Sequence, residues 1–219
     1  MKDSFYTFSY AAALGTICAL LLTGVDHFTG PYKQANARAE KILNILGVLE
    51  VPVPEQLSPQ EAVKIFEASV IEEKLGAVNV YKYLSWGPQT RYNAFGELPS
   101  KANSSIKAVA IPFEGAGLWG PIKGFLALKP DMETILGITI YEQEETPGLG
   151  GEIASPWFRD RFKGKSIIDA SGKPGVRIKQ AGGGLERNEV DAITGATMTC
   201  NKLQTMLNAV IEKVAKELQ

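Results

Sequence analysis

Hydrophobic and polar positions divide the chain into an uncharged N-terminal segment and a longer part with helix and strand patterns. Residues 5–25, FYTFSYAAALGTICALLLTGV, contain no charged side chain. About 20 apolar residues cross a bilayer core as a helix, and aromatic residues such as Phe5 and Phe8 anchor helix ends at the interface. We therefore expect residues 1–30 to form an uncleaved transmembrane anchor with a single span. A cleaved signal peptide and a buried core helix are the alternatives.

Helical periodicity follows in three places. Residues 34–49, QANARAEKILNILGVL, gather their apolar positions on one side of a helix. The sequence Ser58–Glu61 is a capping box with proline at the first helical position, and it predicts a helix from Pro59 to about Lys74. We expect residues 31–75 to form a helical connecting region. A third helical pattern, with apolar residues three and four apart, covers residues 201–218.

The middle of the chain is rich in β-branched and aromatic residues arranged in short runs. Strands are predicted at residues 78–84, 106–113, 122–129, 135–142 and 176–182. A Pro-Asp turn joins the third and fourth of these runs without an intervening helix, which favours antiparallel pairing. The expected fold class is α+β, and residues 76–219 are expected to form a domain of antiparallel strands with flanking helices.

Composition excludes several classes of function. The 219 residues carry a formal net charge of -1 and no basic stripe, so nothing indicates a nucleic-acid partner. Two cysteines and one histidine cannot build a disulfide framework, a closed zinc site or a Ser-His-Asp triad. We read Cys18 as a small apolar membrane residue, His27 as interfacial and Cys200 as a helix-face residue. No catalytic residue and no metal ligand is expected, so any chemistry is expected to come from a cofactor.

Three glycine-rich loops are the candidate binding segments. They are EGAGLWGPIKG at 114–124, EETPGLGGEI at 144–153 and QAGGGLERNEVDAITGAT at 180–197. Glycine allows the backbone to approach a ligand closely and to present its N–H groups. Two of the loops also carry apolar side chains, so together they favour a flat ligand held by backbone and apolar edges. Singly, each loop also fits an ordinary turn.

The last of these loops ends in a threonine beside a helix. In TGAT, Thr194–Thr197, two residues with almost no side chain lie between two hydroxyls. A helix N-terminus favours phosphate, so a phosphate on the Thr197 Oγ1 would lie beside the start of the following helix, for which Thr199 or Asn201 is the candidate cap. The alternative is a turn of small residues that only starts a helix.

The stretch DAITGATMT resembles the flavinylation motif of the FMN-binding domain family, which is shared by the C subunit of the Na+-translocating NADH:quinone oxidoreductase and the G subunit of the Rnf complex. The block ETPGLGGEI and the order of anchor, domain and motif are similar to the family as well. GLWG followed by GFLALKPDMETILGITIYE looks more like the quinone-reductase member of the family. The chain departs from the pattern in being short before GLWG and in having Thr194 where serine is commoner. The resemblance implies that Thr197 carries FMN through a phosphoester, with Asp191, Thr194, Gly195, Ala196 and Thr199 around it.

Further contacts to the flavin are implied by the same resemblance. Candidates for the apolar faces of the ring are Leu118, Trp119 and Leu149. Candidates for backbone or hydroxyl hydrogen bonds are Thr146, Gly148 and Gly150.

The resemblance also implies a function. The chain would be an electron carrier in a Na+-translocating NADH:quinone oxidoreductase, not catalytic alone, relaying electrons between redox centres of other subunits. A flavin transferase would attach the FMN, taking it from FAD with Mg²⁺. The domain would lie on the outer (periplasmic) face of the bacterial cytoplasmic (inner) membrane, although counting Met1 and Lys2 against Lys33, Arg38 and Lys41 favours the opposite side. The alternatives are the Rnf G subunit and a membrane-anchored binding module without redox function.

Overall fold

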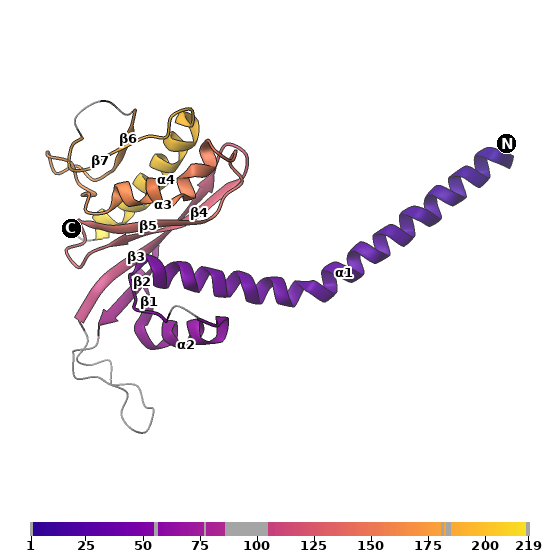
Figure 1. The fold of residues 1–219 in the computed structure, drawn as a ribbon, viewed down its shortest axis with the longest axis horizontal. Coiled ribbons are helices and arrows are strands. Elements are labelled where there is room, and N and C mark those ends of the chain that lie inside the picture. Colours follow the sequence, from indigo (N-terminus) through magenta and orange to yellow (C-terminus); the bar gives the residue numbers. More distant parts are fainter. Residues whose placement is uncertain are drawn as a thin grey trace, which may run out of the picture. The chain divides into compact units, whose positions relative to one another are not determined.

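The computed structural model describes residues 2–54, 57–76, 78–85, 105–180, 182 and 185–217. The chain forms two compact units, Met1–Glu40 and Lys41–Gln219. One helix, α1 (Lys2–Val48), contributes to both of them (Figure 1).

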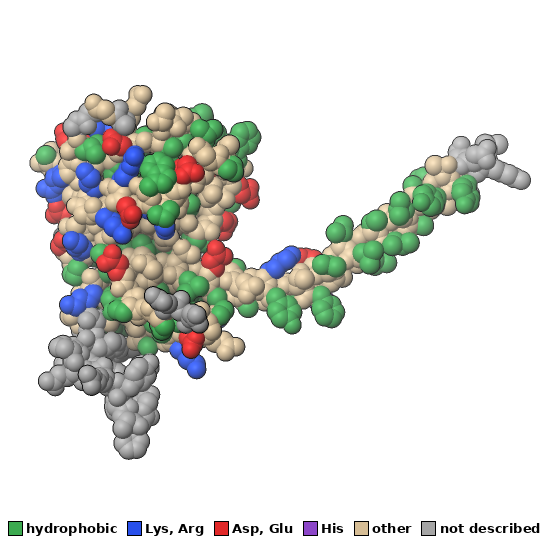
Figure 2. Space-filling view, viewed as in Figure 1, with side chains coloured by type: hydrophobic (Ala, Val, Ile, Leu, Met, Phe, Trp, Pro, Cys, Tyr) green, Lys and Arg blue, Asp and Glu red, His purple; other side chains and the backbone are tan. Residues whose placement is uncertain are grey.

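The N-terminal unit is a single helical segment with apolar side chains around it (Figure 2). The stretch Tyr6–Val48 of α1 contains a window of mean hydropathy 1.8, none of which is buried. Among the described residues this is the one helix that is long and apolar enough to cross a membrane. An apolar window of which nothing is buried against the described residues fits the expected anchor better than a buried core helix.

The second unit is built on a five-stranded sheet with the order β1-β2-β3-β4-β5. The strands are β1 (Val70–Leu75), β2 (Val78–Ser85), β3 (Ser105–Ala116), β4 (Pro121–Leu128) and β5 (Ile135–Glu142). Every neighbouring pair is antiparallel. The predicted antiparallel pairing and the α+β class are thus confirmed, and four of the five predicted runs lie in this sheet.

One predicted helix end is wrong. The helix expected to run to Lys74 is α2 (Pro59–Ser69), and the residues after it form β1. The change occurs at Val70, whose N–H closes the helix on the Phe66 carbonyl while its backbone turns extended. The β-branched pair Val70 and Ile71 then pairs with β2, so sheet formation overrides the helical pattern of the preceding residues.

Helices cover both faces of the sheet (Figure 1). On one face, the end of α1 and α2 pack against Phe125 and Tyr81 of the sheet. On the other face, α4 (Thr197–Glu217) packs with Phe158 and Phe162 against Leu126 and its neighbours. β4 is therefore buried on both sides, which explains its nearly continuous apolar sequence.

The second compact unit begins at Lys41, within the residues 31–75 that we expected to form a helical connecting region. Ile42, Ile45 and Leu46 are at most 5% exposed because they pack on the sheet. The apolar side of the predicted helix is thus part of the domain core.

Short elements fill the second half of the chain, and periodicity did not reveal most of them. They are η2 (Gly150–Ala154), α3 (Pro156–Arg159), η3 (Asp160–Phe162), β6 (Arg177–Lys179) and β7 (Glu189–Asp191). The strand predicted at 176–182 reduces to β6, which pairs in parallel with β7 in a separate two-stranded sheet. β7 lies inside the third glycine-rich loop, where we had expected no strand.

The capping box gives a testable prediction for α2. The Ser58 Oγ accepts a hydrogen bond from the Glu61 N–H, and the Ser58 N–H donates to the Glu61 carboxylate at 2.9 Å. Ser58→Ala is expected to destabilise the helix by about 1 kcal/mol. Hydrogen exchange of the detergent-solubilised full chain should then be about fivefold faster over Pro59–Ser69. Unchanged exchange there would contradict the role of the cap.

The pH dependence of this cap follows from the same contacts. Hydrogen bonds from the Ser58 side chain, and then from its backbone, hold the pKa of Glu61 below its ordinary value of 4.5. Because the folded-state pKa is lowered, the contribution of the Glu61 carboxylate to the stability of the fold is complete above pH 4.5. This contribution is lost as the pH falls through the lowered pKa. The fivefold difference in hydrogen-exchange rate over Pro59–Ser69 between wild type and Ser58→Ala is therefore expected to become smaller in acid.

Candidate functional site

The candidate threonine is the first residue of α4. The preceding turn is closed by a hydrogen bond from the Ala196 N–H to the Ile193 carbonyl, with Gly195 at a φ of 79°. Glycine adopts this φ without strain. The Ala196 carbonyl accepts the first helical bond, from the Cys200 N–H. Thr197 is exposed at the end of this turn, so its hydroxyl is accessible beside the free N–H groups of the helix.

The expected cap of this helix is wrong. Thr199 and Asn201 lie within α4 and not before it. The Thr199 side chain is buried and donates a hydrogen bond of 2.5 Å to the Glu145 Oε2. Thr199 therefore connects the helix to the second glycine-rich loop.

Glu145 joins three parts of the site, and the sequence pattern did not single it out. Its side chain is 4% exposed. Its Oε1 accepts hydrogen bonds from the N–H groups of Leu118 at 2.6 Å and Trp119 at 3.2 Å, and its Oε2 accepts the bond from Thr199. One carboxylate thus holds the first loop, the second loop and the first turn of α4 together. The signal in the sequence was an acidic residue placed directly before the TPGLG stretch.

Glycine is required where these segments meet. A Cβ on Gly150 would lie 2.6 Å from the Thr199 Oγ1 and 2.8 Å from the Glu145 Oε2. A Cβ on Gly117 would clash with the Glu145 Oε1 and with the Gly120 carbonyl. The Gly117 N–H donates to that carbonyl at 2.7 Å, which closes a tight turn. The two residues inside this turn, 118 and 119, protrude into solvent.

These segments enclose a cavity of about 230 Å³. It is lined by Leu118, Trp119, Glu145, Thr146, Leu149, Gly150, Gly195, Ala196, Thr197, Met198 and Thr199. Four of its apolar side chains are unusually exposed: Trp119 at 70%, Met198 at 60%, Leu149 at 43% and Leu118 at 41%. Large apolar groups gathered around one opening indicate a surface that a ligand or a partner covers.

A second cavity, of about 270 Å³, lies on the other side of Thr197. Thr194 and Gly195 line it together with polar residues such as Gln180 and Asn201. Thr197 therefore has an apolar cavity on one side and a more polar one on the other.

Two of the predicted site residues do not line either cavity. Gly148 has a φ of 73° and forms the turn that precedes Leu149. Asp191 is half-buried in β7, and its carbonyl accepts a hydrogen bond of 2.9 Å from Arg161. All the other predicted contacts line one cavity or both. Met198 was not predicted to be at the site.

Few titratable groups line the two cavities beside Thr197. Among the described residues, Glu145 is the titratable side chain that lines the 230 Å³ cavity, and all its described contacts hold backbone and Thr199 in place. Within the part of the chain that the structure describes, no group of three His, Cys, Asp or Glu side chains could hold a metal ion. An accessible hydroxyl at a helix start, beside apolar side chains and glycine backbone, instead fits a flat ligand that bears a phosphate.

This site and fold resemble those of an FMN-binding domain. Residues 117–212 match the model of the family described as the FMN-binding domain, so this part of the chain is similar to that family. The relatives carry a more particular name, the C subunit of a Na(+)-translocating NADH-quinone reductase, and the predicted resemblance to that protein is confirmed.

Three relatives show how far the similarity extends. The C subunit from Neisseria meningitidis is 42% identical over 102 residues, which are 47% of this chain and 40% of that protein. The C subunit from Vibrio campbellii is 45% identical over 106 residues, 48% of this chain and 40% of that protein. The crystal structure of the same reductase component from Parabacteroides distasonis covers 86% of this chain and 96% of its own, with 28% identity and a TM-score of 0.63. The matched region thus spans about 40% of the length of the first two relatives.

The buried thiol of Cys200, in the first turn of α4, gives a further prediction. Cys200 is 1% exposed, and burial raises the pKa of its thiol although the Ile193 N–H donates to the sulfur. The thiolate is the reactive form. In a Cys18→Ala variant at about pH 8, the folded chain is expected to resist iodoacetamide, and the denatured chain to gain one alkyl group by intact mass. Rapid alkylation of the folded chain would show that Cys200 is accessible.

Proposed function

We propose that this chain is a covalent FMN carrier in which the flavin phosphate is esterified to the Thr197 Oγ1. The observation that carries the proposal is the exposed Thr197 at the start of α4, between an apolar cavity and a polar one. In the attachment step the threonine oxygen bonds to the FMN phosphorus of FAD. The bond to AMP breaks, AMP leaves, and the hydroxyl proton is lost. A separate flavin transferase using Mg²⁺ is the proposed catalyst of this step.

The chain's own residues orient the bound group. The free N–H groups and dipole of α4 favour the phosphate. Leu118, Trp119, Leu149 and Met198 offer apolar contact for a ring, and Thr146 offers a hydroxyl. The buried carboxylate at position 145 fixes the loop that carries the first two of these residues. When bound, the flavin supplies the redox chemistry, and the protein supplies position and electrostatics.

The wider role is proposed from the relatives. Proteins similar to this chain are named as the C subunit of a Na(+)-translocating NADH-quinone reductase. By analogy, this chain would relay electrons between redox centres of other subunits, which oxidise NADH and reduce quinone while Na+ is moved. α1 would anchor it in the bacterial inner membrane, with the FMN-binding domain on the periplasmic face. These names favour the quinone-reductase assignment over the Rnf one.

The test is the mass of the denatured protein. The full chain is expressed with and without a flavin transferase, purified in detergent, and denatured. With the transferase, we expect a mass gain of one FMN less one water and fluorescence in a denaturing gel. No gain, with a transferase active on a control protein, would leave a membrane-anchored binding module without redox function as the better explanation.

A further inference from the structure

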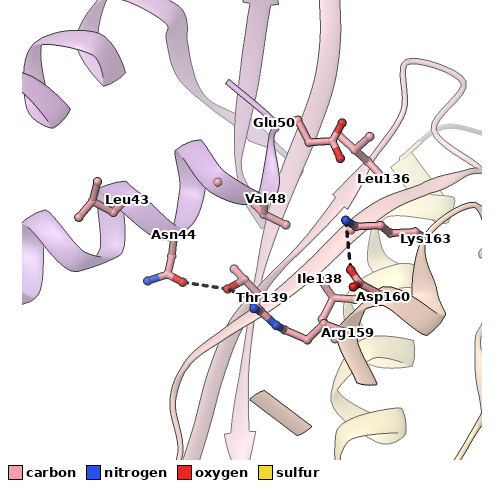
Figure 3. A pocket seen from close by; sticks show the side chains of 12 residues that line it. Leu43, Asn44, Val48, Glu50, Leu136, Ile138, Thr139, Arg159, Asp160 and Lys163 are labelled. Carbon is pink, nitrogen blue, oxygen red and sulfur yellow. Dashed lines mark hydrogen bonds and ion pairs between the residues drawn. The ribbon is translucent and has the colours of Figure 1, made fainter. Parts of the chain in front are cut away.

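A third cavity, which Thr197 does not line, lies within the unit that begins at Lys41 (Figure 3). Its volume is about 390 Å³. The end of α1, the strand β5 and the α3–η3 segment form its walls. It is lined by Leu43, Asn44, Gly47, Val48, Glu50, Leu136, Gly137, Ile138, Thr139, Arg159, Asp160 and Lys163. None of these residues belongs to the site described above.

Arg159 is one of the charged residues that line this cavity. Its Nη1 donates a hydrogen bond of 3.2 Å to the Thr139 Oγ1, which donates in turn to the Asn44 Oδ1 at 2.8 Å. Its Nε–H is buried and has no acceptor among the described residues. No carboxylate in the described part of the chain forms an ion pair with it. A guanidinium with one hydroxyl partner leaves most of its donors unsatisfied by protein.

The other charges of the cavity determine which anion fits. Lys163 pairs with Asp160 at 3.1 Å, so each of these two charges is already compensated. Glu50 has no ion pair among the described residues and lines the same cavity. A ligand with one negative charge can pair with Arg159, whereas a second negative charge would face the carboxylate of Glu50. The lining therefore favours a monoanion.

The remaining walls of the cavity are apolar and leave room for a ligand with a short aliphatic part. Leu43, Val48, Leu136 and Ile138 contribute aliphatic surface. Gly47 is exposed in its helix, and a Cβ there would have no heavy atom within 4 Å. The volume is within the range of small-molecule sites, which combine apolar walls with a few polar groups. A carboxylate also matches the two-pronged donor geometry of a guanidinium.

We propose that this cavity is a monocarboxylate-binding site in which Arg159 pairs with the carboxylate and the apolar walls hold a short aliphatic body. The carboxylate comes either from a free aliphatic acid or from a glutamate or aspartate side chain of another polypeptide. The chemistry of recognition is the same in both cases. The free-acid form is independent of flavin binding at Thr197.

The first experiment uses the full chain in detergent with nitrogen-15-labelled arginine. Sodium butyrate is the probe, sodium chloride at equal ionic strength is the reference, and sodium succinate is the dianionic comparison. The Arg159 Nε–H signal is assigned by its loss in Arg159→Lys. We expect butyrate to shift this signal saturably, chloride to leave it unmoved, and succinate to bind at least about tenfold more weakly because of Glu50.

A blocking variant shows whether the shift arises in the cavity. Gly47→Leu places a side chain in open space and favours the helix, so the fold is expected to persist. It should weaken butyrate binding at least about tenfold while keeping the Arg159 signal. Gly24→Leu is the matched control, because Gly24 is also a helical glycine with open space around it. It should leave butyrate binding unchanged.

A second experiment distinguishes the two sources of the carboxylate and rests on the proposed function. If butyrate does not bind, the other subunits of the complex are co-purified with each variant. A loss of retention of at least about fivefold in Gly47→Leu and Arg159→Lys, but not in Gly24→Leu, assigns the carboxylate to a polypeptide. The proposal is overturned if butyrate leaves the Arg159 signal unmoved and if Gly47→Leu and Arg159→Lys both retain the other subunits as wild type does. A missing flavin mass alone would count against the flavin carrier and not against the butyrate result.

Discussion

Replacing Thr197 with alanine is expected to abolish the flavin that survives denaturation. The proposed phosphoester needs a side-chain oxygen at the first position of α4, and alanine removes this oxygen without disturbing the turn before the helix. Thr197 is exposed, so the cost in stability should be small. The intact mass measured after co-expression with the transferase should fall from that of the flavin-loaded chain to that of the unmodified chain. The folded protein should retain its wild-type unfolding midpoint, corrected for bound flavin.

Two further variants test whether flavin attachment requires a hydroxyl at position 197. Thr197→Ser keeps an oxygen at the same position and is expected to retain covalent flavin, although at a lower yield. Thr205→Ala removes another exposed hydroxyl of α4, whose described hydrogen bond goes to the Asn201 carbonyl at 2.9 Å. It should carry flavin like wild type. Full loading of Thr197→Ala would place the attachment elsewhere and would end the case for Thr197.

Local patterns were sufficient for β2, β3, β4 and β5 of the sheet and for the threonine turn. The runs around β3, β4 and β5 are rich in apolar and β-branched residues, so their type did not depend on distant contacts. The glycine in TGAT predicted a turn, and the structure has Gly195 at a positive φ there. These features are local because a few neighbouring residues determine them.

Other features depend on parts of the chain that are distant in sequence. Val70 extends because β2 pairs with it, and β7 forms because β6 lies beside it. Neither partner can be read from the strand's own few residues. The role of Glu145 depends on Leu118 and Thr199, which are 27 and 54 positions away. A carboxylate in a glycine-rich loop looks solvated until the fold brings such donors to it.

Replacing Glu145 with alanine is expected to be the most damaging change that leaves Thr197 in place. The buried carboxylate accepts two backbone N–H bonds and one hydroxyl bond. Removing it leaves the N–H groups of Leu118 and Trp119 without an acceptor, at a cost of roughly 3 kcal/mol or more. The same change releases the loop that carries two apolar side chains of the 230 Å³ cavity. We therefore expect both a less stable fold and a lower flavin yield.

Stability and flavin yield must be measured separately, because bound flavin stabilises the fold. Urea unfolding is best compared in the Thr197→Ala background, where no covalent flavin is expected. Loading is then measured by intact mass with Thr197 intact. If Glu145 only supports the core, restoring stability at low temperature should restore loading. If it positions the loop, loading should stay low in molecules that are folded.

The variant Glu145→Gln distinguishes the effect of the hydrogen-bonding geometry at position 145 from the effect of its negative charge. Glutamine keeps an oxygen for the N–H groups of Leu118 and Trp119, and its amide can donate to the Thr199 hydroxyl, so Glu145→Gln should cost only about 1 kcal/mol. It should therefore load flavin far better than Glu145→Ala does.

Glu152→Gln is the matched control for this pair of variants. Its half-exposed carboxylate accepts bonds from the Ser155 hydroxyl and the Trp157 indole, which water can replace. Glu152→Gln should load flavin like wild type. If Glu145→Ala also loads like wild type, the contacts of Glu145 do not determine the geometry of the site. The positioning of the apolar loop must then come from the tight turn between Gly117 and Gly120 alone.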